Sequence, residues 1–419
     1  MFLPLKRFSF YSGLICILFI ACTDRDRTNP LDPKNPETLG RPTGVTVISN
    51  LDTVKLSWNF ISLNDLVGYR IYRKAQLQQP FQPIELVASE KTTFLDLDVD
   101  FDVDYTYKIT AVGNDYESPP SDSVKIAPGP TYNWAGNNLA SQLIKLTHDA
   151  RHQIITRTGF FPIVDIEVNS KRREVWVIEN LDEEIGNAIR VTSGGEVLRP
   201  FVEFTSPVDA ALDLNSGALW VADEIASQVA KVDSIGQNLF TIVDFLAPVA
   251  VSVDQNSGDC WVVDRLANKI ARINRDGTQV VFSPENFDSP TSLAVNSSQG
   301  HVWVADKQQV YRVNNDGIIE LQLAVAASKI AINENTNDIW IINLTKTNVS
   351  KWDETGTKMF EVNEFTSAEA LSINSFNNSC LVADSKNNRL VRISEDGKIL
   401  NRFEQISAPT AVAVQNPFD

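Results

Sequence analysis

Short apolar runs separated by polar turns repeat along most of the chain with a nearly constant spacing. From about residue 131 to the last residue, an apolar run that opens with Pro or a small residue is followed by a polar turn and then by a run centred on Trp. Trp220 precedes Pro248 by 28 positions, and Trp134 precedes Pro162 by the same number. Self-similarity with a fixed period of about 40 residues indicates a repeat architecture.

Each repeat contains four β-rich runs. In one copy they cover residues 249–253, 260–263, 269–273 and 279–282, and Asp276-Gly277 suits the last hairpin turn. Four short strands per unit of about 40 residues are typical of a β-propeller blade. The pattern therefore predicts seven blades between residues 131 and 419, around these central residues: Trp134, Trp176, Trp220, Trp261, Trp303, Trp340 and Leu381.

The two ends of the repeat region complement each other. The first copy, from Trp134 to Arg157, lacks an opening strand, and the chain ends after an opening strand at residues 409–414. We expect this last strand to pair with the first copy, because closure leaves no long sheet edge exposed. The alternatives are a ring of six or eight blades and an open solenoid, which needs end repeats with a polar outer face.

The N-terminus is typical of an exported protein. Residues 1–21 contain Lys6 and Arg7 followed by an apolar run that ends at Cys22, as in a secretory signal peptide. The run is shorter than the roughly 20 residues that a membrane-spanning helix needs. Residues 19–22, Phe-Ile-Ala-Cys, resemble the bacterial lipobox, which implies a lipid on Cys22 and anchoring in the cell envelope, at the outer membrane because Thr23 rather than Asp follows. A plain transmembrane anchor or a cleaved signal is the alternative.

Two further segments precede the repeats. Residues 22–40 are rich in Asp, Asn, Arg and Pro and predict a flexible tether. Residues 41–128 alternate apolar and polar positions in short runs, which predicts a small β-sandwich. Trp58 and Tyr105 stand where the fibronectin type III domain has its core Trp and its tyrosine corner, and the segment resembles that domain. The resemblance implies a spacer or a binding arm.

Composition narrows the class of partner. The 419 residues carry a formal net charge of −16, which argues against binding to nucleic acid or to an anionic membrane surface. Cys260 and Cys380 lie in blades three apart around the predicted ring, so we expect no disulfide between them and interpret both as small buried hydrophobic side chains.

Two series of polar residues run through all seven copies. An acid or amide follows each central residue by three positions: Asn137, Glu179, Asp223, Asp264, Asp306, Asn343 and Asp384. A base lies on each third run: Lys145, Arg190, Lys231, Arg272, Arg312, Lys351 and Arg392. In the structural interpretation, the acids and amides cap the loops and pair with neighbouring bases. In the functional one, they form a ring on the face where the loops between blades converge, and this ring binds a basic partner or a divalent cation such as calcium.

The blade sequence also resembles NHL-type repeats, through Trp220-Val-Ala-Asp223 and Asn268-Lys-Ile-Ala-Arg272-Ile. That resemblance implies recognition of a protein or another polymer, although lactonase-like and lyase-like relatives are enzymes. No catalytic residues are predicted, because His148, His152 and His301 have no metal-ligand spacing. We therefore expect a lipid-anchored binding or scaffolding protein with no cofactor. The alternative is a metal-assisted lyase or a lactonase-like hydrolase that uses carboxylates on the propeller face.

Overall fold

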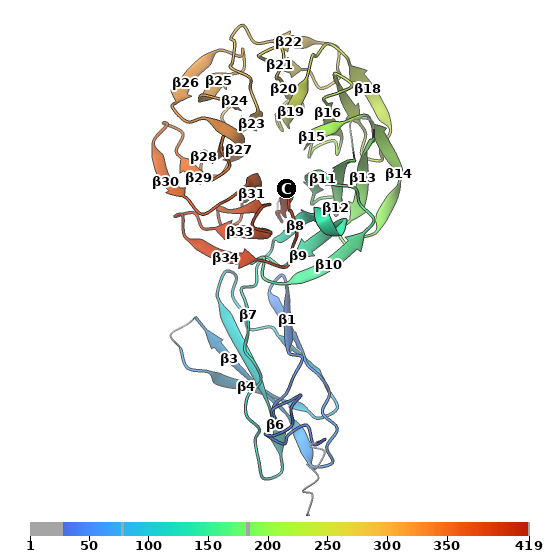
Figure 1. Cartoon of the computed structure of the whole chain (residues 1–419), viewed down its shortest axis with the longest axis vertical. Coiled ribbons are helices and arrows are strands. Elements are labelled where there is room, and N and C mark those ends of the chain that lie inside the picture. The colour runs from blue at the N-terminus through green and yellow to red at the C-terminus, as the bar shows by residue number, and fades with distance from the viewer. Residues whose placement is uncertain (1–27, 77–78, 182–184, 418–419) are drawn as a thin grey trace, which may run out of the picture.

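The chain folds into a ring of seven sheets joined at its rim to an elongated β-sandwich (Figure 1). The computed structural model describes residues 28–76, 79–181 and 185–417. The predicted fold class, a sandwich followed by a seven-bladed propeller, is confirmed. The predicted signal peptide and Cys22 lie outside the described residues. Among the residues that are described, no helix is long and apolar enough to cross a membrane.

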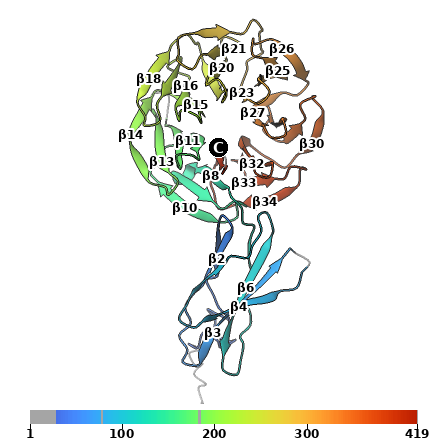
Figure 2. The same cartoon turned by 180° about the vertical axis from the view of Figure 1, so that it is seen from behind.

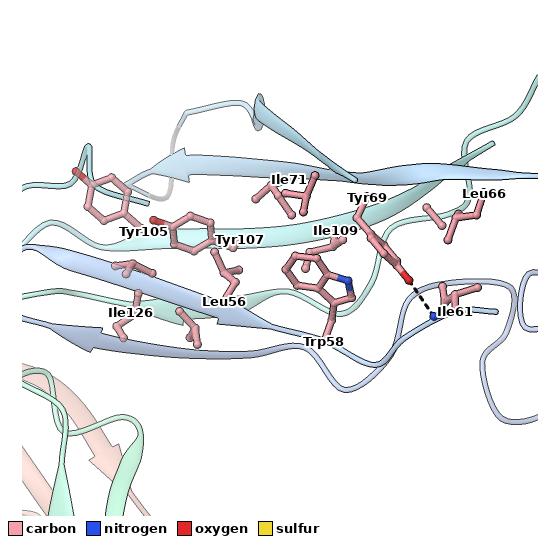
Figure 3. Packing of buried hydrophobic residues seen from close by; sticks show 14 residues of the cluster. Leu56, Trp58, Ile61, Leu66, Tyr69, Ile71, Tyr105, Tyr107, Ile109 and Ile126 are labelled. Atoms are coloured by element: carbon pink, nitrogen blue, oxygen red, sulfur yellow. Dashed lines mark hydrogen bonds between the residues drawn. The ribbon is translucent and has the colours of Figure 1, made fainter. Parts of the chain in front are cut away.

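The sandwich, called the arm below, packs a three-stranded sheet on a four-stranded one. The first sheet has the order β1 (Thr46–Asn50), β2 (Thr53–Ser57), β5 (Thr93–Asp96), and the second β4 (Gln82–Ala88), β3 (Leu66–Ala75), β6 (Tyr105–Gly113), β7 (Val124–Ile126). Trp58 meets Tyr69 edge to face at 5.2 Å between ring centroids, and Tyr69 Oη accepts a hydrogen bond from the Ile61 amide (Figure 3). Tyr105 Oη accepts another from the Asp100 amide. Membership of the fibronectin type III family stays a prediction.

The described part of the segment predicted as a tether contains local hydrogen bonds, and its role as a flexible tether stays a prediction. Residues 29–40 form turns in which the Asn29, Asp32 and Asn35 side chains accept hydrogen bonds from nearby backbone amides. Leu31 packs against the sandwich core. Asn and Asp stabilise such turns locally, which composition alone does not reveal.

Each blade is a four-stranded antiparallel sheet whose first strand lies nearest the ring axis. The blades consist of β35 (Val412–Gln415), β8 (Tyr132–Asn137), β9 (Gln142–Leu146) and β10 (Gln153–Thr158); β11 (Ile163–Asn169), β12 (Glu174–Asn180), β13 (Gly186–Thr192) and β14 (Val197–Phe204); β15 (Pro207–Leu212), β16 (Leu219–Asp223), β17 (Gln228–Val232) and β18 (Asn238–Ile242); β19 (Pro248–Val253), β20 (Cys260–Asp264), β21 (Lys269–Ile273) and β22 (Val280–Phe282); β23 (Ser292–Asn296), β24 (His301–Ala305), β25 (Val310–Asn314) and β26 (Ile319–Leu323); β27 (Ala327–Asn333), β28 (Asp338–Asn343), β29 (Val349–Trp352) and β30 (Lys358–Val362); and β31 (Ala368–Asn374), β32 (Ser379–Asp384), β33 (Arg389–Ile393) and β34 (Ile399–Phe403). We number them blades 1 to 7 in this order.

Closure of the ring follows the prediction. The C-terminal strand β35 pairs antiparallel with β8, with Val412 opposite Ala135 and Val414 opposite Asn133. Trp134 Nε1 also donates to Gln415 Oε1 at 3.2 Å. The chain thereby ends at the centre of the ring, as Figure 1 shows.

The hydrophobic core of the ring lies between blades. Trp220 of blade 3 is fully buried in one cluster with Val251, Cys260 and Val262 of blade 4, and the other central residues pack on the following blade in the same way. Cys260 and Cys380 are both buried free thiols. A buried indole contributes several kcal/mol to the free energy of unfolding. Because each indole lies between two blades, the Trp series stabilises the packing of one blade on the next.

The bases of the third strands lie in this layer and do not pair with the acid series, whereas Asp384 of that series pairs with another neighbouring base, Arg389, at 2.9 Å. In every blade the strand register places the base directly opposite the central residue, as for Trp220 and Lys231. Lys231 Nζ lies 4.6 Å from the Trp220 ring centroid and donates to the carbonyl oxygen of Arg275 in blade 4 at 2.7 Å. Lys145, Arg190, Arg312 and Lys351 bond to carbonyls of the following blade likewise.

The seam between blades 7 and 1 departs from this rule, because the arm completes it. The central residue is Leu381, and the opposite base, Arg392, reaches Asp102 of the arm at 3.4 Å. The Asp102 carboxylate also accepts hydrogen bonds from Asn377 Nδ2 and His148 Nε2, both at 2.8 Å. His148 is buried, and its Nδ1 lies 2.5 Å from the Thr131 hydroxyl oxygen. One arm carboxylate thus bridges the two blades at the closing seam.

We predict that Asp102→Ala lowers the stability of the ring by about 1–3 kcal/mol, because Arg392 and His148 lose a charged acceptor. Burial raises the pKa of Asp102, but the hydrogen bond from His148 and the charge of Arg392 outweigh burial and hold that pKa below its ordinary value. The stabilisation is therefore fully present above the unfolded-state pKa of about 3.9 and is lost as pH falls through the folded-state pKa.

Thermal unfolding of wild type, Asp102→Ala and the exposed control Asp100→Ala across this pH range measures the effect. Equal melting temperatures for wild type and Asp102→Ala at neutral pH would show that the arm does not contribute to closure.

Candidate functional site

The ring of acids and amides lies at the ends of the second strands, on the face that carries the loops between blades. We call this the upper face; the hairpins between the third and fourth strands lie on the lower face. The structure places all seven predicted residues at equivalent positions around the ring: Asn137, Glu179, Asp223, Asp264, Asp306, Asn343 and Asp384.

The four aspartates of this series point into the protein. Asp264 is 1% exposed, and its two oxygens accept hydrogen bonds from the Leu246, Ala247 and Ala267 amides at 2.8 to 3.2 Å. It therefore ties the loop that enters its blade to the loop after its second strand. Asp223, Asp306 and Asp384 do the same with their own pairs of loops.

The remaining three members of the series, Glu179, Asn137 and Asn343, also accept hydrogen bonds from loop residues. Glu179 accepts from the Phe161 amide and from Asn187 Nδ2, both at 2.9 Å, and burial raises its pKa. Asn137 accepts from the Ser407 amide, and Asn343 from the Thr347 and Asn348 amides. This geometry is what loop capping requires. Ligand binding by the series stays a prediction.

A second constellation, which the sequence analysis missed, lines the central channel. A cavity of about 370 Å³ is bounded by residues from the first strands of all seven blades. Asp165, Asp209 and Lys329 occupy the same register position on β11, β15 and β27, each opposite the residue that precedes the acid or amide of its blade. Glu167 lies two residues further along β11.

An ion pair spans this channel. Lys329 Nζ of blade 6 donates to Asp209 Oδ1 of blade 3, on the opposite side of the ring, at 2.7 Å. The other Asp209 oxygen accepts from the Val251 amide of the next blade, and Asp165 accepts from the Ala210 amide in the same manner. Ser252, Ser292 and Ser372 also cap amides of the following first strand. These side chains satisfy N–H groups on the inner sheet edges.

Crowding of charge in the channel shifts the protonation of its acids. Burial and the nearby Asp209 charge raise the pKa of Asp165 to about 7, despite the opposing effect of Lys329. Burial and the charge of Asp165 raise the pKa of Glu167 well above its ordinary value. Burial lowers the pKa of Lys329, but the three carboxyl groups outweigh burial and raise it overall. Near neutral pH, Asp165 can both give and take a proton beside a fixed ammonium–carboxylate pair.

The signal for this constellation was present but weak. The first strands otherwise carry mostly Val, Ala, Ile and Ser, so the charged residues Asp165, Glu167, Asp209 and Lys329 stand out on them. Within residues 28–76, 79–181 and 185–417, no group of three or more His, Cys, Asp or Glu side chains is placed to hold a metal ion.

Comparison with solved structures supports the fold. A protein of unknown function from Desulfotomaculum acetoxidans matches 68% of this chain and 99% of its own length at 13% identity, with a TM-score of 0.58. Proposed 6-phosphogluconolactonases from Bacteroides uniformis and Bacteroides fragilis match 68% of this chain at 12% and 11% identity, 99% and 97% of their own lengths, with TM-scores of 0.56 and 0.55.

These neighbours are propeller proteins, and at such low identity the likeness shows the fold alone. No protein-family model and no curated protein matches the chain. Any activity must therefore be argued from the residues of this chain.

The capping geometry predicts that Asp264→Ala lowers stability by about 1–2 kcal/mol. Asp264→Asn also destabilises the protein, because an amide nitrogen cannot accept the hydrogen bonds that one carboxylate oxygen now takes. Calcium changes neither melting temperature. Thermal melts with and without calcium measure this, with Asp244→Ala, an exposed acid in the same entering loop, as the control. An Asn variant more stable than wild type, or a calcium-dependent shift lost in the variants, would instead identify the acids as a ligand site.

Proposed function

We propose that the protein is an exported, lipid-anchored binding protein that presents its propeller to a protein partner at the cell envelope, with Cys22 as the site of lipidation and the outer membrane as its location. Recovery of the wild-type chain in the soluble fraction without detergent would contradict the anchor. The observation that carries the binding proposal is an arc of exposed aliphatic side chains on the upper face.

The arc follows the loops after the second strands of blades 1 to 4. The residue two positions after the acid or amide is aliphatic and exposed in each of these blades: Leu139, Leu181, Ile225 and Leu266. Val243 and Leu246, in the loop between blades 3 and 4, add to it, with 69% and 61% exposure. The same position is polar in blades 5 and 7, where Gln308 and Lys386 stand. The apolar surface therefore has a boundary, as an interaction site does.

The position of the arm leaves this surface accessible. In the two opposite views of the molecule, the arm extends from the rim and covers neither face of the ring (Figures 1 and 2). Exposed aliphatic side chains at equivalent positions of four successive blades favour a partner that has apolar side chains of its own, and the net charge of −16 disfavours nucleic acid.

The test is retention of an envelope protein by an immobilised chain without the lipid. We expect the double variant Ile225→Asp/Leu266→Asp to retain at least about tenfold less of the partner than wild type, because interface centres tolerate charge poorly. Val281→Asp, an equally exposed site on the outer strand of blade 4, is the matched control and retains the partner fully. No retention by wild type, or equal retention by the double variant, would contradict the proposal.

A second candidate function rests on Asp165 in the channel. Its pKa of about 7 suits general acid and base catalysis, and the likeness to proposed lactonases makes ester or lactone hydrolysis the reaction to examine. In that reaction Asp165 would take a proton from water as the water oxygen bonds to the lactone carbonyl carbon and the carbonyl oxygen becomes an oxyanion. As the carbonyl re-forms and the ring C–O bond breaks, Asp165 would give that proton to the departing ring oxygen. The Lys329 ammonium would stabilise the oxyanion.

For this candidate, the rate of lactone hydrolysis rises with pH through about 7 as Asp165 ionises. Asp165→Asn abolishes it, whereas Glu203→Gln, on the exposed outer strand of the same blade, does not. Acid release from a panel of sugar lactones measures the rate. Activity that survives Asp165→Asn, or its absence from wild type with every lactone, would remove the channel from consideration as a catalytic site.

A further inference from the structure

A second cavity opens on the lower face between blades 5 and 6, away from the channel and the aliphatic arc. It has a volume of about 370 Å³, and its lining includes His301, Arg312, Glu320 and Glu354. His301 is the first residue of β24, and Arg312 lies on β25. Glu354 belongs to the hairpin between β29 and β30 of blade 6.

In other blades, the Lys or Arg of the third strand lies near an acidic residue at the start of the second strand. The residue two positions before the central Trp lies near the base, and in three blades it is an acid. Arg190 lies 3.6 Å from Glu174, Arg272 lies 3.9 Å from Asp259, and Lys351 lies 2.8 Å from Asp338. In blade 5 this position is occupied by His301. Arg312 therefore lacks the carboxylate that blades 2, 4 and 6 supply from their own second strand.

Two nitrogen atoms beside this cavity have no hydrogen-bond partner; among the described residues Arg190 Nε of blade 2 has none either, although Glu174 lies 3.6 Å from that guanidinium. No residue in the described part of the chain makes a hydrogen bond with His301 Nε2 or with Arg312 Nε, although both atoms are buried. His301 is only 9% exposed. Arg312 uses Nη1 to bond to the Glu354 carbonyl at 2.9 Å, which fixes the guanidinium with Nε free. Buried polar atoms without a partner are rare and costly, so each needs an explanation.

The charges of the residues around His301 Nε2 and Arg312 Nε determine which kind of ligand the cavity favours. Burial, and then the charge of Arg312, lower the pKa of His301 to about 4, so its ring is neutral at pH 7 and Nε2 can carry a proton. Glu320 Oε2 lies 3.7 Å from Arg312 Nε, an ion-pair distance like those of Arg190 and Arg272 to their acids, and the Glu320 side chain is 43% exposed. None of these three distances is short enough for a hydrogen bond. Glu354 contributes its carbonyl to Arg312 rather than its carboxylate.

We propose that this cavity binds a small carboxylate, with one oxygen accepting from Arg312 Nε and the other from His301 Nε2. The bound group takes the place that Glu174, Asp259 and Asp338 hold in their blades. A carboxylate is preferred to a larger polyanion because Glu320 and Glu354 repel additional negative charge. The carboxylate belongs to a free small acid or to the C-terminus of a peptide.

The proposal predicts a coupling to pH with a defined sign. A bound anion beside His301 favours the protonated imidazole, so binding takes up a proton and the affinity for carboxylate rises as pH falls from 7 toward 5. Removing the competing acid with Glu320→Gln strengthens binding several-fold at neutral pH.

The experiment follows the imidazole nitrogen signals of the full folded chain by NMR, with the His301 signals assigned through His301→Gln. Acetate and butyrate are the free acids, and a short peptide with a free or an amidated C-terminus separates the two sources of carboxylate. We expect a saturable shift of the His301 signals with acetate. Arg312→Lys keeps a charge near the Glu354 carbonyl but removes Nε, and it weakens binding at least about tenfold. Arg272→Lys, whose site already contains Asp259, leaves binding unchanged.

Absence of a saturable shift in wild type would overturn the proposal. So would binding that persists in Arg312→Lys or that is lost equally in Arg272→Lys. Peptide binding that requires the free C-terminus would identify the peptide source, and binding of acetate and butyrate alone would identify the small acid. None of these outcomes depends on the aliphatic arc of the upper face.

Discussion

Blades 1, 2, 3, 5 and 6 are each held to the next blade by a Lys or Arg side chain that lies on a tryptophan and donates to a carbonyl of the neighbouring blade. Lys231 shows the arrangement in full: its stem covers Trp220, and its ammonium reaches Arg275 O at 2.7 Å. The base is nearly buried, at 5% exposure, so it needs both the indole face and the carbonyl to offset its desolvation. The base lies opposite the central residue within its own blade, and the carbonyl that it reaches belongs to the following blade. The same side chain therefore contributes both to strand pairing within a blade and to the contact between blades.

The closing seam shows what happens when this arrangement is incomplete. Leu381 gives Arg392 no aromatic face, and the carbonyl contact is replaced by the Asp102 carboxylate of the arm. The loop that contains Asp102 is fixed in turn by a hydrogen bond from its own amide to the Pro128 carbonyl. The arm is therefore part of the closure. Asp102 therefore contributes contacts to both blades at the seam between blades 7 and 1.

Much of this architecture could be predicted from the sequence because the repeat constrains it. The Trp spacing indicated seven blades, and the unmatched strands at the two ends indicated closure between β35 and β8. Contacts that depend on strand register, or on residues far apart in the sequence, could not be predicted from the neighbouring sequence. Spacing placed the acids and bases on their strands, but only the antiparallel register shows that the bases face tryptophans. Lys329 and Asp209 are 120 residues apart, and nothing near either residue indicates that they meet across the channel.

In a repeat protein, equivalent positions share nearly the same backbone environment, so the residues at these seven positions can be compared directly. The comparison indicates which residue type the stability of a blade requires at that position. Where most blades agree, as in the aspartates that cap loops, stability explains the residue. Where one blade has a different residue type at the position, stability alone does not explain that residue. Lys329 stands where three other blades have Ala, and His301 stands where three blades have an acid. Both changes add charge or leave buried donors unsatisfied, and natural sequences tend to break local rules of this kind at functional sites. These departures, rather than the repeated polar series, therefore mark where ligands are to be sought.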